Sequence, residues 1–247
     1  MKTFVVGASG ATGRLLVAQL LKRDLHVKII ARTIESLPDH VRHHANLSII
    51  QESILNLSDA EMAQHVNDCV AVASCLGHNL NFKGIFGQPR QLVTDATRRL
   101  CIAIKANYPA QSVKFVLMNT TGNRNLDLAE PMIFAERCVM RLIRLLLPPH
   151  GDNEDAANYL RTEIGQNDTT IEWVVVRPDT LINDSEVTPY EIYPSPIRSA
   201  IFNAGKTSRV NVAHFMAELI TDHHTWNRWK GQMPVIYNTS PSTENRQ

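Results

Sequence analysis

The sequence has almost no net charge. Its 247 residues carry 25 lysines and arginines against 24 aspartates and glutamates, so the formal net charge is +1. Because the two kinds of charge are nearly equal in number, the protein has no strong electric field of one sign. This argues against nucleic acid or an anionic membrane as the main partner. We therefore expect a small molecule as the ligand.

Cysteine is scarce, and long apolar runs are absent. The four cysteines lack the C-x-x-C spacing of redox and zinc motifs: Cys69, Cys75, Cys101 and Cys138. Reduced thiols of this kind are typical of a cytoplasmic protein. No run approaches the roughly 18 apolar residues of a membrane span, and the first predicted strand begins at residue 3, which leaves no room for a signal peptide. We expect a soluble, cytoplasmic protein.

A metal-ligand pattern is also missing. The histidine pairs at 43–44 and 223–224 lie in polar segments without carboxylate or cysteine partners at ligand spacing. Such partners are what a zinc site requires. We interpret these histidines as solvated residues and expect no metal site.

The beginning of the chain carries its most informative pattern. Residues 3–6 form an uncharged run of β-branched and aromatic residues, as a strand buried on both faces requires. Gly7, Gly10 and Gly13 follow at every third position, and apolar residues then recur at helical spacing to about residue 22. A strand, a glycine turn and a helix N-terminus together predict a phosphate-binding loop.

This loop resembles a known fingerprint. The stretch from Gly7 to Gly13, Gly-Ala-Ser-Gly-Ala-Thr-Gly, is similar to the G-x-x-G-x-x-G of the extended and atypical short-chain dehydrogenase/reductases. That superfamily includes NAD-dependent epimerase/dehydratase-like proteins, relatives of biliverdin/flavin reductase and regulators of nitrogen metabolite repression. The end of the strand at 113–118 and the pair Arg177-Pro178 carry the same resemblance. It implies a Rossmann-like fold that binds NAD(P).

We predict one α/β domain over residues 1–238, a doubly wound and mainly parallel sheet, followed by a polar tail at 239–247. Further strands are predicted at 26–31, 47–51, 69–75, 113–118, 171–176 and 234–237. Helices are predicted at 58–66, from 92 onward, at 131–147, 151–164 and 210–221, with a loop at 79–90. Proline and serine are frequent in the small C-terminal region at 179–206, which we interpret as a substrate-capping excursion of short irregular pieces.

Arg32 favours NADP over NAD. An acidic residue about twenty positions after the glycines would accept hydrogen bonds from the ribose of NAD, whereas Arg32 suits the 2′-phosphate of NADP. Arg14 is a second candidate for that phosphate, and the alternative is that Arg32 is a solvated strand end. Relatives often carry an Asp near the adenine where this chain has Gln51 and Glu52, so the adenine contact stays open.

Residues at the carboxyl ends of parallel strands line the ligand crevice of such folds. With the glycine loop they form the predicted cofactor site: Gly7, Ser9, Gly10, Ala11, Thr12, Gly13, Arg14, Arg32, Cys75, Leu76, Gly77, Asn119 and Pro178. The resemblance also implies a Ser or Thr beside the substrate carbonyl. Thr120 and Thr121 match that position, with turn formation as the alternative, and His78 is either a proton donor or a solvated loop residue.

The usual acid of the superfamily, a Tyr with a Lys four residues later, is missing. The residues four positions after the tyrosines are Ser112, Glu163, Pro194, Ile197 and Pro241. The main hypothesis is therefore an NADPH-dependent oxidoreductase without this pair, acting on a small carbonyl, quinone or flavin-like substrate as a monomer or homodimer. The alternatives are a non-catalytic protein that senses NADP(H) and, third, an epimerase-like enzyme acting on sugar nucleotides.

Overall fold

The structure, a computed structural model, describes residues 1–78, 87–128, 130 and 134–239. Its main sheet contains the strands β1 (Lys2–Val6), β2 (His26–Ile30), β3 (Leu47–Ile50), β4 (Ala71–Ser74), β5 (Val113–Met118), β6 (Ile171–Pro178), β8 (Tyr190–Tyr193) and β10 (Val235–Asn238). Their order is β3-β2-β1-β4-β5-β6-β10-β8, and all neighbours pair in parallel except β8, which is antiparallel to β10. The predicted doubly wound α/β fold is confirmed.

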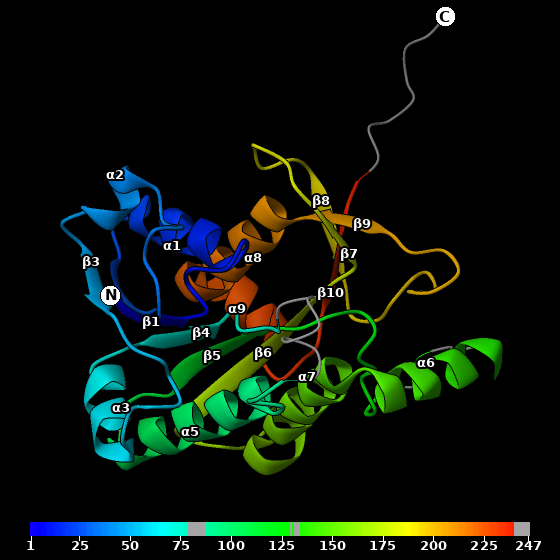
Figure 1. Ribbon diagram of the computed structural model, residues 1–247, viewed down its shortest axis with the longest axis horizontal. Coiled ribbons are helices and arrows are strands. Elements are labelled where there is room, and N and C mark those ends of the chain that lie inside the picture. The colour runs from blue at the N-terminus through cyan, green and yellow to red at the C-terminus, as the bar shows by residue number, and fades with distance from the viewer. Residues whose placement is uncertain (79–86, 129, 131–133, 240–247) are drawn as a thin grey trace, which may run out of the picture.

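Helices cover both faces of this sheet (Figure 1). One face carries α1 (Gly13–Leu21), α2 (Asp39–Arg42), α8 (Arg209–Thr221) and α9 (His223–Trp229), and the other carries α3 (Asp59–Val66), α5 (Leu92–Ala106) and α7 (Pro148–Tyr159). Successive residues of a strand point to opposite faces, so Val5 packs in the first layer while Phe4 and Val6 pack in the second. All three are fully buried, as a central parallel strand requires.

The order of the strands reverses beside β1. Strand β1 pairs with β2 on one side and with β4 on the other, so Val6 lies between Ile30 and Ser74 at the carboxyl edge. Chain connections leave this point in opposite directions, which opens a crevice between them. The glycine loop follows directly after Val6 and therefore lies at that crevice.

The segment at 179–206 is more regular than the sequence indicates. It includes β7 (Thr180–Ile182), which pairs in parallel with β9 (Lys206–Ser208), and β8, which extends the main sheet. Tyr190 and Ile192 of β8 pack against the core layer that contains α8. Prolines on both sides of β8 obscure this short strand, and its pairing with β10 is long-range.

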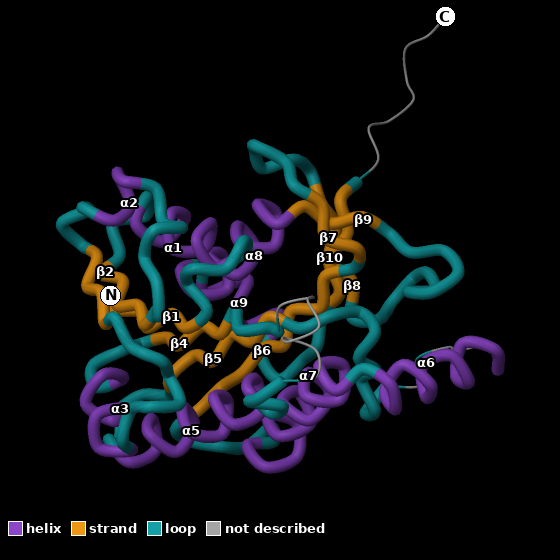
Figure 2. The backbone as a smooth tube through the Cα atoms, in the orientation of Figure 1, coloured by secondary structure: helices purple, strands orange, loops and turns teal. Residues whose placement is uncertain are grey.

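Figure 2 shows the helices and strands along the backbone, and some of their limits differ from those predicted. Of the helix expected at 131–147, the described part is α6 (Phe134–Leu146), and residues 131–133 lie outside the description. Pro148 begins α7, because proline suits the first turn of a helix, and a π-helical turn (Leu160–Ile164) ends the segment. Helix α9 was not expected; Asp222 caps it by accepting the N–H of Thr225 at 2.7 Å.

Two expected irregular segments lie largely outside the described residues, namely 79–86 of the predicted loop and 240–247 of the predicted tail. Within the described part of the chain, no helix combines the length and the apolar content needed to cross a membrane.

Candidate functional site

The glycine loop turns from β1 into α1 within six residues, and two of its glycines leave no room for a side chain. Gly7 has a φ of +72°, and a Cβ there would lie 2.5 Å from the carbonyl carbon of Cys75. A Cβ on Gly13 would meet the carbonyl oxygen of Gly7. Gly10 closes the turn by donating its N–H to that oxygen at 3.0 Å. The backbone is thus held in a tight turn that a phosphate could approach closely.

The N-terminus of α1 is uncapped, which suits an anion. Among the residues described there, Thr12 at the N-cap makes no side-chain capping bond, and the first turn contains no acidic residue. Three other helices are capped by side chains, those of Ser58, Ser208 and Asp222. The N–H groups and the positive dipole end of α1 therefore face the loop without a protein partner side chain.

A cleft of about 580 Å³ opens beside the loop, at the carboxyl ends of β1, β2 and β4. This volume is in the range of small-molecule sites. Its walls contain seven of the residues predicted to bind the cofactor: Gly7, Ser9, Gly10, Arg32, Cys75, Leu76 and Gly77. Ala11, Thr12, Gly13 and Arg14 continue from the loop into the first turn of α1.

Among the described residues, Arg32 is the cation in the wall of this cleft. It follows β2 and is exposed, so its guanidinium is accessible to a ligand. The segment behind it is tied to the glycine loop, because the Ser36 hydroxyl donates to the carbonyl of Ser9 at 3.0 Å. Arg14 is also exposed, on the first turn of α1.

The wall also contains residues that the sequence did not identify. Gln88, Pro89 and Leu92 line it from the segment that leads into α5, and 53–56 line it after β3. Glu52, left open as an adenine contact, lines the cleft too, and its Oε1 accepts from the N–H of Ser53 at 2.7 Å. These residues follow no spacing rule, because the fold alone brings their segments to one opening.

The ends of β5 and β6 lie side by side next to this region. Asn119 donates its N–H to Val176 at 2.8 Å, and Thr121 donates its N–H to Pro178 at 3.0 Å. The Asn119 side chain stabilises the turn after β5, since its Oδ1 accepts a hydrogen bond from the N–H of Thr120 at 2.9 Å. One cluster at the carboxyl edge thus contains four residues that were predicted separately from the sequence: Asn119, Thr120, Thr121 and Pro178.

The two threonines have different surroundings. Thr121 is buried, whereas Thr120 is half-buried and its hydroxyl accepts the N–H of Gly122 at 3.3 Å. Thr121 lies beside the buried carboxyl of Asp179. Burial raises the pKa of Asp179, although hydrogen bonds from Gly205, Thr180 and Thr121 lower it in part. Thr121 therefore lies beside a carboxyl group whose pKa is raised by burial.

Arg177 supports this edge from within. Its guanidinium forms a bidentate ion pair with Glu130, at 2.6 Å and 3.2 Å, and both side chains are almost completely buried, at 0% and 3% exposed. It also donates to the carbonyl oxygens of Asn123 at 2.8 Å and Met233 at 2.7 Å. Arg177 of the Arg-Pro pair therefore ties the turn after β5 to the segment that leads into β10.

His78 is held by a buried carboxylate. Its Nε2 lies 2.7 Å from Oδ2 of Asp152, and both side chains are nearly inaccessible. Burial alone would raise the pKa of Asp152, but hydrogen bonds from His78 and from Thr94 and Val93 hold that pKa below its usual value. His78 is thus an oriented histidine next to Gly77 of the cleft wall, a partnership that sequence spacing does not indicate.

Tyr159 lies on α7, in the layer that packs against α5. The guanidinium of Arg98 stacks on its ring at 5.7 Å. Burial and neighbouring acidic groups, including Glu163, raise the pKa of its phenol. A raised pKa makes this tyrosine a weaker acid than usual. Within the described residues, no cluster of three metal-ligating side chains occurs.

Comparison with known proteins adds the following. The model of a family described as NAD(P)H-binding matches residues 7–223. No curated protein matches the sequence significantly. Among solved structures, a wide-type short-chain dehydrogenase/reductase from Veillonella parvula, in complex with NADP, has a TM-score of 0.69 at 17% identity, covering 99% of this chain and 96% of its own.

Two other solved structures are similar. An oxidoreductase from Lactococcus lactis has a TM-score of 0.68 at 18% identity, covering 97% of this chain and 92% of its own. A candidate NADH-flavin reductase from Streptococcus pneumoniae has a TM-score of 0.65 at 17% identity, covering 97% and 100%. At these identities the likeness shows the fold.

Proposed function

Because this chain belongs to the NAD(P)H-binding family, we propose that it is an NADPH-dependent oxidoreductase of the atypical short-chain type. Its substrate would be a small carbonyl, quinone or flavin-like molecule. The observation that carries the proposal is the cleft at the reversal of strand order, with a glycine cradle and Arg32 both in its wall. A cytoplasmic location is part of the proposal and is supported by four unpaired thiols, all in described segments. The proposal also includes a monomer or homodimer.

The residues present fit the phosphates of the cofactor. A side chain at Gly7 or Gly13 would collide with backbone, so the loop is shaped for a group that approaches the main chain closely. The uncapped N-terminus of α1 would stabilise the negative charge of a pyrophosphate. Arg32 would bind the 2′-phosphate through charge-assisted hydrogen bonds, which supports NADPH over NADH.

The ends of β5 and β6 would receive the substrate. When bound, NADPH supplies the hydride for the reduction. The Thr121 hydroxyl would turn from Asp179 to donate its hydrogen bond to the substrate oxygen and orient it, while Arg177 and Glu130 hold the edge in place. The proton would come from water or from a weak donor, with Thr121, Thr120 and His78 as the candidates. Asp152 would fix the tautomer and direction of the His78 ring.

One observation favours a second function. The sequence has no tyrosine with a lysine four residues later, so the usual acid of these reductases is missing. The same cleft would then serve a protein that binds NADP(H) and alters its contact with a partner. The third hypothesis, an epimerase-like enzyme, is weaker because such chemistry normally needs the same missing pair.

NADPH oxidation separates these functions. The purified protein would be supplied with NADPH and a panel of quinones, flavins and small aldehydes or ketones, and absorbance of the reduced nicotinamide followed over time. The proposal expects turnover with at least one class, with NADPH preferred over NADH. Tight NADPH binding without turnover of any acceptor would instead support the sensor.

A further inference from the structure

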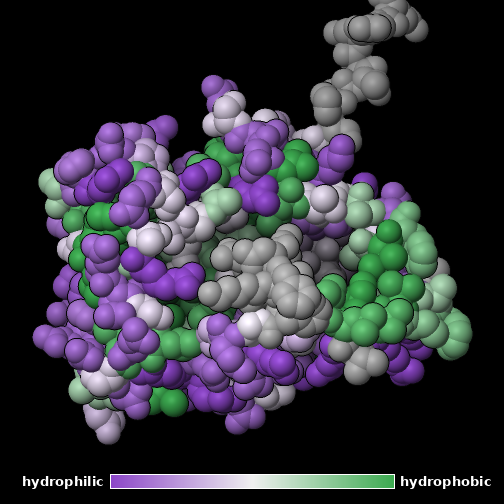
Figure 3. All heavy atoms as spheres, viewed as in Figure 1, coloured by the Kyte–Doolittle hydropathy of each residue, from purple (hydrophilic) through white to green (hydrophobic). Residues whose placement is uncertain are grey.

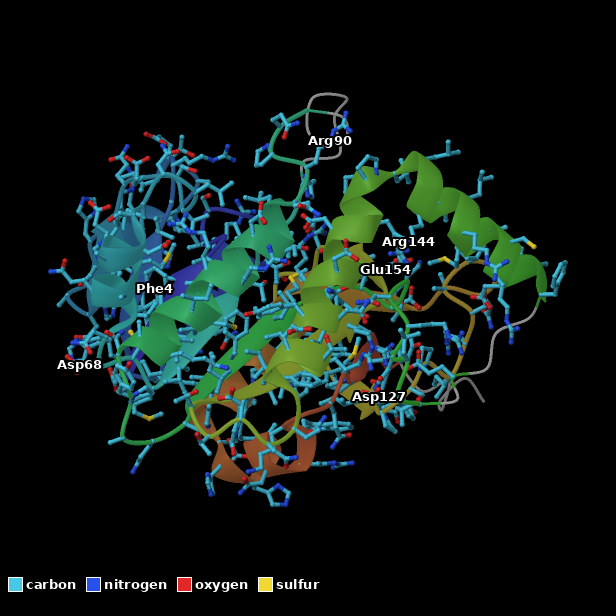
Figure 4. The ribbon with its side chains drawn as sticks, turned by 90° about the horizontal axis from the view of Figure 1, so that it is seen from below. Phe4, Asp68, Arg90, Asp127, Arg144 and Glu154 are labelled. Atoms are coloured by element: carbon cyan, nitrogen blue, oxygen red, sulfur yellow. The ribbon has the colours of Figure 1, made fainter. Side chains whose placement is uncertain are left out.

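Helix α6 packs on the protein through one side, which contains the buried Glu136 and the half-buried Val139, Met140 and Ile143. Glu136 is buried and accepts a hydrogen bond from Ser199 at 2.7 Å. Arg144 forms an ion pair with Glu154 of α7 at 3.1 Å, and Figure 4 shows these two side chains together where the helices meet. These contacts fix α6 on the protein and leave the rest of its surface open to solvent.

Other large apolar side chains of α6 face solvent. Phe134 is 81% exposed, Leu142 54% and Leu146 56%. The adjacent loop between β8 and β9, which Ser199 joins to α6, exposes Ile197 and Phe202 on the same part of the surface. We call these five side chains the α6 patch, and Figure 3 shows apolar atoms gathered there. Monomeric proteins rarely expose a contiguous patch of large apolar side chains without a binding role.

Arginines border the patch. Arg137 and Arg141 are exposed and follow Phe134 by three and seven residues, so helical spacing places them along one edge of the apolar stripe. The helix contains one acidic residue, the buried Glu136. The exposed charges of α6 itself are therefore positive, although the whole chain is nearly neutral.

This charge pattern decides between two occupants. A second copy docked through the same patch would bring two pairs of arginines together, with no exposed acidic residue of α6 to offset them. An anionic phospholipid surface offers acyl chains for the apolar side chains and phosphates for the arginines. A high amphipathicity with Phe and Leu on one side and Arg beside them is typical of helices that lie in such a surface.

We propose that the α6 patch docks this protein on the surface of anionic phospholipid membranes, with Phe134, Leu142 and Leu146 inserted below the head groups. This inference is independent of the proposed reductase activity. It also departs from the expectation drawn from the net charge, because the local distribution of charge governs contact with a membrane over a few ångströms.

Cys138 offers a direct probe, since it is exposed on α6 while Cys69 and Cys101 are buried. Burial raises the pKa of the Cys75 thiol to about 12, so Cys138 should react selectively at neutral pH. An environment-sensitive fluorophore on Cys138 would be titrated with phosphatidylcholine vesicles, with and without phosphatidylserine. We expect a blue shift with phosphatidylserine vesicles, which added salt reverses, and co-flotation of unlabelled protein with the same vesicles.

Variants keep the test specific. Leu142→Glu should lower vesicle affinity at least about tenfold, and the double change Arg137→Ser and Arg141→Ser should lower it roughly tenfold or more. Ile102→Glu is the matched control, because Ile102 is 51% exposed on α5, away from the patch, and should bind as the unchanged protein does. Circular dichroism and NADPH titration would check that each variant is folded.

Three results would overturn the proposal. They are no binding to either vesicle, equal binding to neutral and anionic vesicles, and equal loss in Ile102→Glu and Leu142→Glu. A concentration-dependent dimer that shields Cys138 without vesicles present, and does not bind them, would assign the patch to a second copy instead.

Discussion

Replacing Gly13 by alanine tests whether the glycine loop is built for close backbone approach. The new Cβ would meet the Gly7 carbonyl oxygen and lie 2.8 Å from its carbonyl carbon, whereas ordinary contact begins at 3.4 Å. The loop and α1 must therefore separate by more than about half an ångström. Overpacking of this kind costs about 1–3 kcal/mol, which exceeds the gain of up to about 1 kcal/mol that alanine gives a helix interior.

We expect a net loss of about 1–2 kcal/mol and a fall in Tm of roughly 2–8 °C, measured by calorimetry without cofactor. NADPH affinity should fall by more than about tenfold, because the displaced loop carries the phosphate contacts. Gly151→Ala is the control, since a Cβ there meets nothing within 4 Å, and it should keep both stability and affinity. NADPH binding by Gly13→Ala at the original strength would refute the assignment of this loop.

Further predictions concern the substrate end and the pH dependence. Thr121→Val should lower kcat/KM by about a hundredfold, which is the effect of one lost orienting donor, whereas Tyr159→Phe should keep most of the activity. If the Thr121→Val and Thr120→Val variants were both as active as the unchanged protein, neither threonine would take part in the mechanism. Hydrogen bonds from Lys105 and backbone N–H groups outweigh burial and lower the pKa of Asp168 to about 2. That carboxylate therefore stabilises the fold above pH ~4, and the contribution is lost as pH falls toward about 2. Urea unfolding of Asp168→Asn should show a deficit at neutral pH that shrinks in acid.

Local patterns predicted the framework of the site. Gly7 and Gly13 were identified from their spacing. The collision that excludes a side chain at Gly13 is with Gly7, within the loop itself, whereas the one at Gly7 is with Cys75 after β4. The strand at β5 was predicted with the same limits as observed, since a buried parallel strand is a continuous apolar run. The edge that receives β8 was missed, because pairing with β10 depends on residues far apart in the sequence.

Long-range partners could not be read from spacing. Asp152 orients His78 from 74 positions away, and Glu130 neutralises Arg177 across 47 positions. Each of these carboxylates is one among 24 acidic residues with no local pattern to distinguish it. The structure identifies these two carboxylates because both are buried, and a buried carboxylate needs a partner in direct contact. The structure therefore confirms the fold that the sequence predicted, while the roles of individual site residues stay predictions.

Titration of NADPH and NADH against the unchanged protein and Arg32→Ala tests the central claim most directly. If Arg32 binds the 2′-phosphate, the variant should lose about 1.5–3 kcal/mol of NADPH binding, roughly ten- to a hundredfold, with hardly any change for NADH. Arg228→Ala, an exposed arginine on α9, is the control for a general loss of positive charge. Equal affinity of the unchanged protein for NADPH and NADH would contradict the account.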